Sequence, residues 1–156
     1  MSGSWATAPE LSPEVFAALS QVGAAAGPIV LVATVDSDGS PRTAPFGSLR
    51  ALTPQRLRFG CGREHDTFAN IVRDGRVVVS LLAKPNVAVS IRGRARVVKE
   101  RMDLLDSDAV VEIAVDEVKN DADVGTEFEI TSQVAVSYPE GLLPLVERYV
   151  AEVEEG

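Results

Sequence analysis

The feature that most constrains this chain is an alternating run of residues from Val87 to Val98. In its sequence, VAVSIRGRARVV, small or apolar residues take every second position and polar residues fall between them. Because successive side chains of a β-strand point to opposite faces, this run predicts a strand with one face in the core. The predicted core face carries Val89, Ile91, Gly93, Ala95 and Val97, and the other face carries Ser90, Arg92, Arg94 and Arg96. The arginine face is predicted to lie in solvent or along a crevice, and Gly93 predicts a bulge or a close backbone approach.

Seven strands are predicted along the chain, separated by turn residues such as Asp36-Ser37-Asp38-Gly39. They are Pro28–Val35, Pro41–Leu49, Arg56–Cys61, Arg76–Leu82, Asn86–Lys99, Val110–Val118 and Phe128–Tyr138. Helices are predicted over about residues 12–21, 66–73 and 142–154, the first with Ser12 as its N-cap and Pro13 at its first position. The chain is therefore predicted to be mainly β with peripheral helices. We expect one domain over residues 1–156, with a largely antiparallel barrel over residues 28–138.

The composition fits one globular domain and argues against some partners. Of the 156 residues, 46% are hydrophobic and 24% charged, close to the globular average. A net charge of −8 argues against a nucleic-acid partner, because phosphate neutralisation needs clustered Lys and Arg. Most arginines lie between Arg42 and Arg101, whereas Asp and Glu dominate from Asp103 onward. A basic middle on an acidic protein favours a small anionic ligand over a polyanion.

The sequence predicts neither secretion nor a membrane span. No basic and then apolar leader opens the chain, and the apolar runs have the length of strands. The single cysteine, Cys61, excludes an intrachain disulfide and is most simply a small buried hydrophobe. Trp5 stands in a small, polar stretch that we expect to be a loose terminus. We therefore expect a cytoplasmic protein without a membrane partner.

The richest polar cluster is Arg63-Glu64-His65-Asp66-Thr67, at the start of the second predicted helix. A helix start presents free backbone N–H groups and a partial positive charge. In one interpretation Asp66 or Thr67 caps the helix, and Arg63 and the helix amides hold a phosphate. In the other, the segment is an ordinary capped helix with a surface arginine, and the local sequence leaves both open. Glu64 and Asp66 oppose an anion site unless they point away from it or pair with their cationic neighbours.

Several other chemistries lack support in the sequence. His65 is the only histidine and no G-x-S-x-G motif is present, so a hydrolase triad is not predicted. One His and one Cys match no zinc template, and we expect no metal site. Neither a G-x-G-x-x-G nor a Walker motif occurs. The sequence therefore assigns no catalytic side chain.

The segment Pro45-Phe46-Gly47-Ser48 interrupts the second predicted strand. Pro and Gly disrupt a β-ladder on one side, which would leave backbone amides and the Ser48 hydroxyl free to meet a flat ligand. A β-bulge at a barrel rim is compatible with the same sequence.

The order of these segments resembles a known superfamily. The series LVATV, DSDGSP, RTAPF, LRFGCGRE, DTFANIVRDGRV, VVVSLL and VSIRGRARVV, within residues 28–118, is similar to the FMN-binding split-barrel proteins. These include the pyridoxamine 5′-phosphate oxidase-like proteins and their flavin-reductase relatives. The resemblance implies a six-stranded antiparallel split β-barrel that forms a homodimer, with FMN in a crevice at the interface. It also implies an oxidoreductase acting on a small molecule, in which the flavin supplies the chemistry and no catalytic side chain is required.

The resemblance also implies roles for individual residues. By position, the segment Pro45–Ser48 would face the isoalloxazine ring, and Cys61 and Gly62 would offer backbone groups at the flavin edge. Arg63, His65 and Thr67 would address the phosphate. Arg94 would approach the crevice from a neighbouring strand.

Two alternatives to an FMN oxidase stay open. The pattern D-T-x-x-N-I at residues 66–71 resembles the flavin-reductase branch, in which a hydroxyl and helix amides bind the phosphate where oxidases carry Lys or Arg. The deazaflavin F420 is a possible cofactor of such a barrel. The other alternative is a binding module without flavin redox activity, which would bind haem or no small ligand. The C-terminal stretch, rich in Glu, offers no basic set for a pyridoxamine phosphate.

Overall fold

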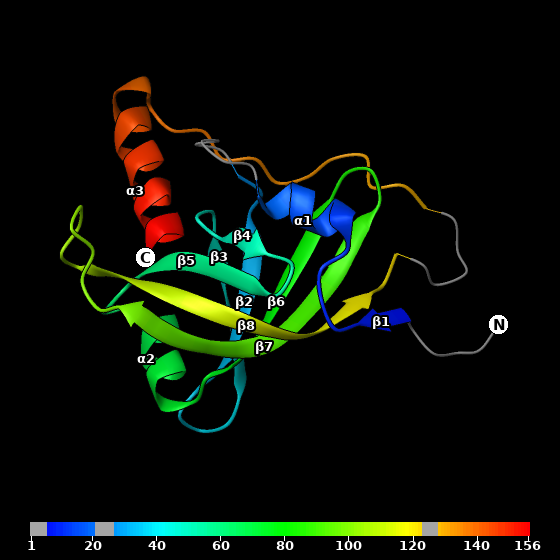
Figure 1. Cartoon of the computed structure of the whole chain (residues 1–156), viewed down its shortest axis with the longest axis horizontal. Coiled ribbons are helices and arrows are strands. Elements are labelled where there is room, and N and C mark those ends of the chain that lie inside the picture. The colour runs from blue at the N-terminus through cyan, green and yellow to red at the C-terminus, as the bar shows by residue number, and fades with distance from the viewer. Residues whose placement is uncertain (1–5, 21–26, 123–127) are drawn as a thin grey trace.

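A computed structural model describes residues 6–20, 27–122 and 128–156 of the chain (Figure 1). The strands are β1 (Ala6–Ala8), β2 (Val30–Val35), β3 (Pro41–Phe46), β4 (Arg50–Thr53), β5 (Arg56–Gly62), β6 (Arg76–Ala83), β7 (Val87–Lys99) and β8 (Asp108–Asn120). The helices are α1 (Pro13–Leu19), α2 (Asp66–Arg73) and α3 (Leu143–Glu155), with a 3-10 turn η1 (Glu140–Leu142) before α3. Trp5 lies outside the described residues.

Antiparallel pairing joins the eight strands of the described residues into one sheet. The order is β3-β2-β6-β7-β8-β5-β4, and β1 pairs with β8. β3 and β4 lie at the two ends of this order although they follow one another in the chain, so the sheet curls round without closing (Figure 1). The predicted fold class, a mainly β split barrel with peripheral helices, is confirmed. Six strands correspond to predicted ones, whereas the short strands β1 and β4 were not predicted.

The strand predicted over Phe128–Tyr138 is wrong. This segment forms no ladder, and most of its residues are exposed. Its backbone reaches the rest of the protein through the Ile130 amide, which donates to the Pro85 carbonyl at 2.8 Å. The alternation in SQVAVS is typical of a strand, but a strand also needs a neighbour with free backbone groups. The barrel therefore ends with β8 at Asn120 and not near residue 138.

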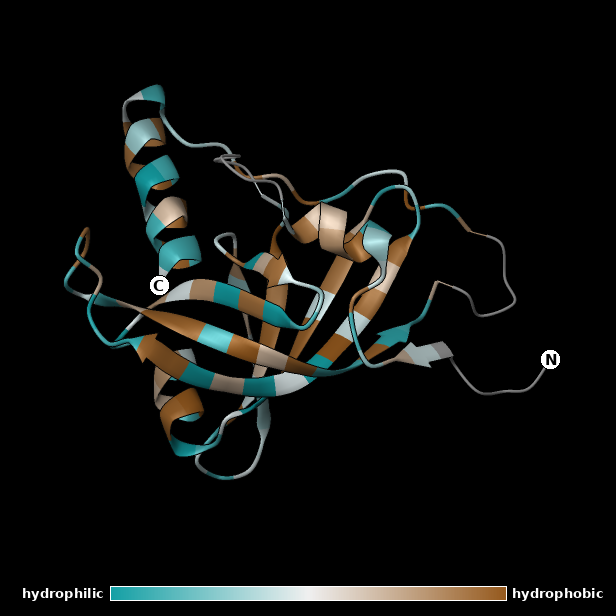
Figure 2. Cartoon of the chain, in the orientation of Figure 1, coloured by the Kyte–Doolittle hydropathy of each residue, from teal (hydrophilic) through white to brown (hydrophobic). Residues whose placement is uncertain are grey.

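The alternation predicted for β7 is confirmed. Val89, Ile91, Gly93 and Ala95 are buried, whereas Arg92, Arg94 and Arg96 are exposed. Figure 2 shows the resulting hydrophobic and hydrophilic bands along β7 and β8. The register shifts between Arg92 and Gly93, and a Cβ atom on Gly93 would collide with the Ala114 carbonyl oxygen. Both the predicted bulge and the predicted close approach are therefore present.

A buried carboxylate, Glu112 on β8, organises the outer face of β5, β8 and β7. Arg58 Nε donates to it at 3.1 Å and an Arg96 terminal nitrogen at 3.0 Å. Arg56 Nε lies 3.4 Å from the same carboxylate. Arg58 also donates to the Glu154 carbonyl at 3.0 Å, which ties the last turn of α3 to the sheet. Three arginines of this face thus share one buried carboxylate.

The helices cover different parts of the barrel. The Ser12 hydroxyl accepts from the Val15 amide and caps α1 as predicted, although α1 ends at Leu19 instead of Gln21. α1 packs against β4, α2 against β2, β5 and β7, and α3 against β5 and β4 (Figure 1). Over the described ranges, no helix has the length and apolar character needed to cross a membrane.

Candidate functional site

Two predicted parts of the site, the corner at residues 45–48 and the start of α2, lie side by side. The centre of the Phe46 ring is 4.8 Å from that of Phe59 and 5.7 Å from that of the His65 imidazole. Phe59 is fully buried on β5, so it fixes Phe46 between the core and α2. The fold therefore brings together segments that the sequence separates.

The N-cap of α2 is His65, and the predicted caps Asp66 and Thr67 are wrong. His65 Nδ1 accepts a hydrogen bond from the Thr67 amide at 3.0 Å, and the His65 carbonyl accepts from the Phe68 amide at 3.0 Å. An unprotonated imidazole nitrogen supplies the acceptor that a hydroxyl or carboxylate usually provides. In this tautomer Nε2 carries the proton, so exposed His65 presents one N–H donor beside the helix start.

The inner face of α2 is structural. Thr67 is only 1% exposed, so its hydroxyl lies inside the protein. Asn70 Nδ2 donates to Thr34 Oγ1 at 3.0 Å and to Asp36 Oδ1 at 2.8 Å, which anchors α2 on β2 and its hairpin. The threonine and asparagine of the D-T-x-x-N-I pattern therefore hold the helix in place.

Arg63 contains an unsatisfied donor. Its backbone amide donates to the Ser107 carbonyl at 2.9 Å, which fixes the turn before α2. Its side-chain Nε is buried and has no hydrogen-bond partner within the described ranges. Leaving a buried polar N–H unpaired costs about 1–3 kcal/mol. An anion bound here would remove that cost.

The two acidic residues of the cluster do not neutralise it. Glu64 and Asp66 are exposed, and among the residues that the structure describes neither forms an ion pair with Arg63 or His65. Asp66 instead contributes to the raised pKa of Arg42, which is due mainly to the hydrogen-bonded Asp36 carboxylate. Pairing with the cationic neighbours is therefore absent among the described residues, and the acidic objection to an anion site stands.

Cys61 and Gly62 lie between the corner and α2. Cys61 is buried, and its Sγ donates to the Gly62 carbonyl at 3.6 Å. Burial raises the pKa of the Cys61 thiol to about 12, so it stays protonated at neutral pH. The predicted interpretation as a small buried hydrophobe is confirmed. A buried, protonated thiol is a weak nucleophile.

The corner at residues 45–48 is held rigidly from behind. Ser48 Oγ accepts from the Gly60 amide at 3.0 Å, so the expectation of a free Ser48 hydroxyl is wrong. Arg50, only 1% exposed, donates to the carbonyls of Gly47 at 3.1 Å and Leu49 at 2.9 Å. Sequence reasoning missed the role of Arg50, which the charge alone did not signal.

A pocket of about 310 Å³ opens on the other side of this corner. All four residues Pro45–Ser48 line it, and Leu105 adds to one wall. The opposite wall comes from the C-terminal segment and carries Tyr138, Leu145, Val146, Tyr149 and Val150. The sequence predicted the helix but not this wall, because amphipathicity alone does not show where a helix packs.

α3 is attached to the rest of the site by Tyr149. Its hydroxyl donates to Asp108 Oδ2 at 2.5 Å. Burial and the Asp108 carboxylate raise the pKa of Tyr149, so the phenol stays neutral. The Tyr149 ring lies where a Cβ atom on Gly60 would be, so only glycine fits at that position.

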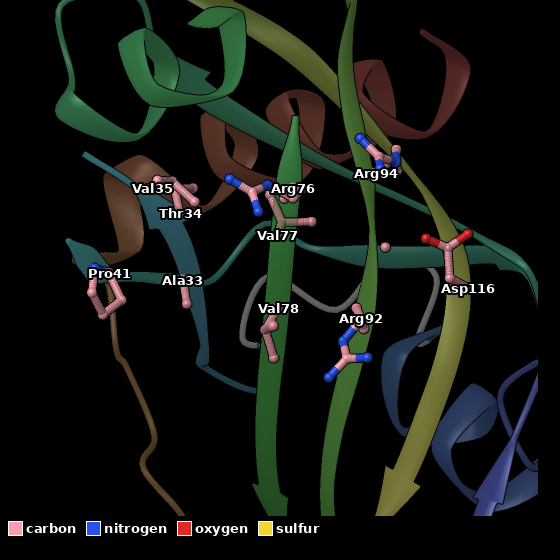
Figure 3. A pocket seen from close by; sticks show the side chains of 11 residues that line it. Ala33, Thr34, Val35, Pro41, Arg76, Val77, Val78, Arg92, Arg94 and Asp116 are labelled. Atoms are coloured by element: carbon pink, nitrogen blue, oxygen red, sulfur yellow. The ribbon is translucent and has the colours of Figure 1, made fainter. Parts of the chain in front are cut away.

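A second cavity, of about 270 Å³, lies on the outer face of β2, β6 and β7. Figure 3 shows its arginines, Arg76, Arg92 and Arg94, spread along two strands, with Arg76 and Arg94 extending to opposite sides. Asp74 binds Arg76 at 2.7 Å, and the hydrogen bonds from Arg76 lower the pKa of Asp74 to about 2. Arg94 thus lines this cavity and not the pocket beside residues 45–48.

Comparison with known proteins identifies one family. Residues 18–132 match the family model described as pyridoxamine 5′-phosphate oxidase. No curated protein matches the chain.

Solved structures with the same fold are distant in sequence. A Lactobacillus delbrueckii protein that carries the provisional name pyridoxamine 5′-phosphate oxidase is 24% identical, with a TM-score of 0.56, over 70% of this chain and 93% of that one. Group A Streptococcus HupZ is 18% identical, with a TM-score of 0.60, over 76% and 99%. An F420 reductase is 16% identical, with a TM-score of 0.55, over 69% and 98%. At these identities the likeness shows the fold alone.

Proposed function

The chain belongs to the pyridoxamine 5′-phosphate oxidase family, and from this premise we propose that it is a cytoplasmic flavoprotein that binds FMN. When bound, FMN would supply hydride or electron transfer to or from a small molecule. The protein would supply binding, orientation and exclusion of water. This division fits a site in which the Cys61 thiol is protonated and the Tyr149 phenol is committed to Asp108.

The observation that carries the proposal is the buried Arg63 Nε, which lacks a partner within the described residues. A phosphate is an anion with several acceptor oxygens, so it would satisfy this donor through a charge-assisted hydrogen bond. His65, the N-cap at the positive end of α2, follows Arg63 by two residues in the chain. These three features fit the FMN phosphate.

The remaining predicted residues would act through their backbone. The Pro45–Ser48 segment, held by Arg50, would support the edge of the isoalloxazine ring through its backbone, which would leave the pocket that the segment lines beside the ring. Gly62, whose carbonyl accepts from the His65 amide at 3.0 Å, would define the flavin edge together with Cys61. Thr67 would contribute by positioning α2, since its side chain is buried.

The absorption spectrum of the protein as purified, followed by titration with FMN, tests the proposal. We expect flavin bands, or FMN binding by the colourless protein. Arg63→Ala should weaken FMN binding about ten- to a hundredfold, the value of one or two hydrogen bonds to a charged group. Arg101→Ala, which removes an arginine paired with Asp106, serves as the matched control. A protein that remains colourless in excess FMN would overturn the proposal.

We also propose a homodimer with the cofactor at its interface. Large apolar side chains are exposed on the outer sheet face, where Leu31 (44% exposed) pairs opposite Ser80, and Leu82 (66% exposed) lies two residues beyond it. Such a patch favours contact with a second copy. Sedimentation should show a dimer at micromolar concentration that Leu82→Glu weakens. A wild-type monomer that binds FMN would contradict the dimer alone.

A module without flavin chemistry, binding haem or no small ligand, is the second candidate. It is favoured by the commitment of the Thr67 amide to His65 Nδ1, which removes one phosphate donor. F420 is a third, since one similar structure is an F420 reductase. FMN, F420 and haem differ in their visible spectra, so the same measurement separates the three.

A further inference from the structure

The pocket that α3 closes is uncharged. Among the described residues that line it, none is Asp, Glu, Lys, Arg or His. The nearest buried cation, Arg50, lies behind the corner, is only 1% exposed, and donates to the Gly47 and Leu49 carbonyls. A ligand in the pocket would therefore meet no charged side chain of the protein.

The charged residues of α3 are held away from this pocket. Glu152 accepts from the Asp103 and Leu104 amides at 2.6 and 2.9 Å, and Lys99 Nζ lies 3.1 Å from its carboxylate. Lys99, Arg148, Glu152 and Glu155 line a different hollow on the far side of the helix. The acidic composition of the C-terminal segment therefore does not extend to the pocket wall.

The side-chain polar groups of the pocket are the hydroxyls of Ser48, Tyr138 and Tyr149, and the Ser48 hydroxyl accepts from the Gly60 amide. The Tyr149 hydroxyl is committed to Asp108, so this residue presents its ring. The Tyr138 hydroxyl oxygen would lie 3.8 Å from a Cβ atom on Gly47, which places it at the corner. The pocket thus offers aromatic and aliphatic surface together with the Tyr138 hydroxyl.

This lining decides between two classes of ligand. An uncharged ring gains from burial of its apolar surface and from contact with aromatic side chains. A phosphate group would lose its hydration without meeting a cation in the pocket, and the nearby Asp108 carboxylate would repel it. Both effects favour an uncharged ring over a phosphorylated ligand.

We propose that this pocket binds an uncharged, largely apolar ring molecule, and that substrates of the protein belong to this class and not to phosphorylated amines. That the bound molecule is a substrate rests on the proposed function. The preference for an uncharged ring follows from the pocket itself. A volume of about 310 Å³ suits a small ring system.

Two probes that share one ring and differ by a phosphate group test the preference. 2-Naphthol and 2-naphthyl phosphate carry the same ring, and their binding to the protein as purified is measured by calorimetry. We expect 2-naphthol to bind at least about tenfold more tightly. Equal binding, tighter binding of the phosphate, or no binding of either probe would overturn the proposal.

Charge introduced into the wall should invert this preference. Leu145→Arg places a cation in the pocket, so we expect about fivefold weaker 2-naphthol binding and tighter 2-naphthyl phosphate binding. Leu142→Arg is the matched control, because Leu142 is similarly exposed (45% against 38%), close in sequence, and outside the pocket lining. Equal shifts in both variants would contradict the proposal. Tyr138→Phe, a milder change, should weaken 2-naphthol binding about threefold if Leu145→Arg fails to fold.

The FMN titration of Arg63→Ala is independent of these measurements. FMN binding without a preference for 2-naphthol would overturn the pocket assignment and leave the flavoprotein proposal intact. A clear preference for 2-naphthol in a protein that takes up no FMN would overturn the flavoprotein proposal and leave the pocket assignment intact.

Discussion

Two sets of arginines in this protein have opposite environments. Arg56, Arg58 and Arg96 surround the buried Glu112 carboxylate, with nitrogen–oxygen distances of 3.0 to 3.4 Å. Arg63, at the start of α2, has a buried Nε without a partner in the described part of the chain. The first three arginines have an anionic partner within the fold, whereas Arg63 Nε has no partner among the described residues.

This difference separates charge that the fold itself compensates from a buried donor that it leaves unpaired. A buried carboxylate is stable only when cations and hydrogen bonds compensate its lost hydration, and the Glu112 cluster meets that requirement. A buried donor left unpaired stabilises nothing in the isolated protein. The proposed FMN phosphate would supply the acceptor that this donor lacks.

The largest expected effect comes from removing the carboxylate of the complete cluster. Glu112→Gln would leave three arginines around a neutral amide, and we expect a loss of about 3 kcal/mol in the free energy of unfolding. Urea unfolding measures it. Glu117→Gln, whose carboxylate is 42% exposed and 3.8 Å from Arg92, should cost less than about 0.5 kcal/mol. Similar losses in the two variants would remove the distinction between the clusters.

A smaller effect of opposite sign is expected at Arg63. Arg63→Met keeps most of the side-chain stem but removes the unpaired Nε, so the unliganded protein should gain up to about 1 kcal/mol. Added FMN should raise the melting temperature of the wild type and not of this variant. Arg58→Met, which loses contacts to Glu112 and the Glu154 carbonyl, should be destabilised. If Arg63→Met is destabilised equally, Arg63 belongs with the structural set.

The smallest effect is expected for an exposed pair, Asp74 and Arg76. The hydrogen bonds from Arg76 lower the pKa of Asp74 from 3.8 to about 2 in the folded protein. Because the folded value is depressed, the pair stabilises the fold above about pH 4, and this contribution is lost as the pH falls through 2.

Melting temperatures of the wild type and Asp74→Asn, measured between pH 5 and pH 2, should therefore converge as the pH falls. Asp66→Asn, which changes an exposed carboxylate outside any ion pair of the described residues, is the control. A constant difference between wild type and Asp74→Asn would contradict the assignment.

Much of the fold could be predicted from sequence because its signals are local. The alternation in β7 and the turn at Gly39, where φ is +87°, each depend on a few neighbouring residues. The error at residues 128–138 shows the limit, since alternation cannot tell whether a partner strand has a free edge. The short strand β4 was missed because the preceding corner was taken as a continuation of β3.

The candidate site was predicted less completely. The sequence and the family resemblance indicated the corner and the α2 start, and the structure brings Phe46 against His65. The cap by His65 was missed because histidine is not among the usual capping residues. The pocket wall on α3 was missed because it depends on long-range packing of that helix against β5.

The Tyr149 ring can pack against β5 at the pocket only because residue 60 has no side-chain carbon. A methyl group at position 60 would take the space of the Tyr149 ring and push α3 outward. Gly60→Ala would therefore displace one wall of the pocket, while all the residues that line it keep their chemistry. A glycine that contributes no functional group thus gives an experimenter a way to separate how tightly the protein holds a ligand from how well it shields that ligand from water.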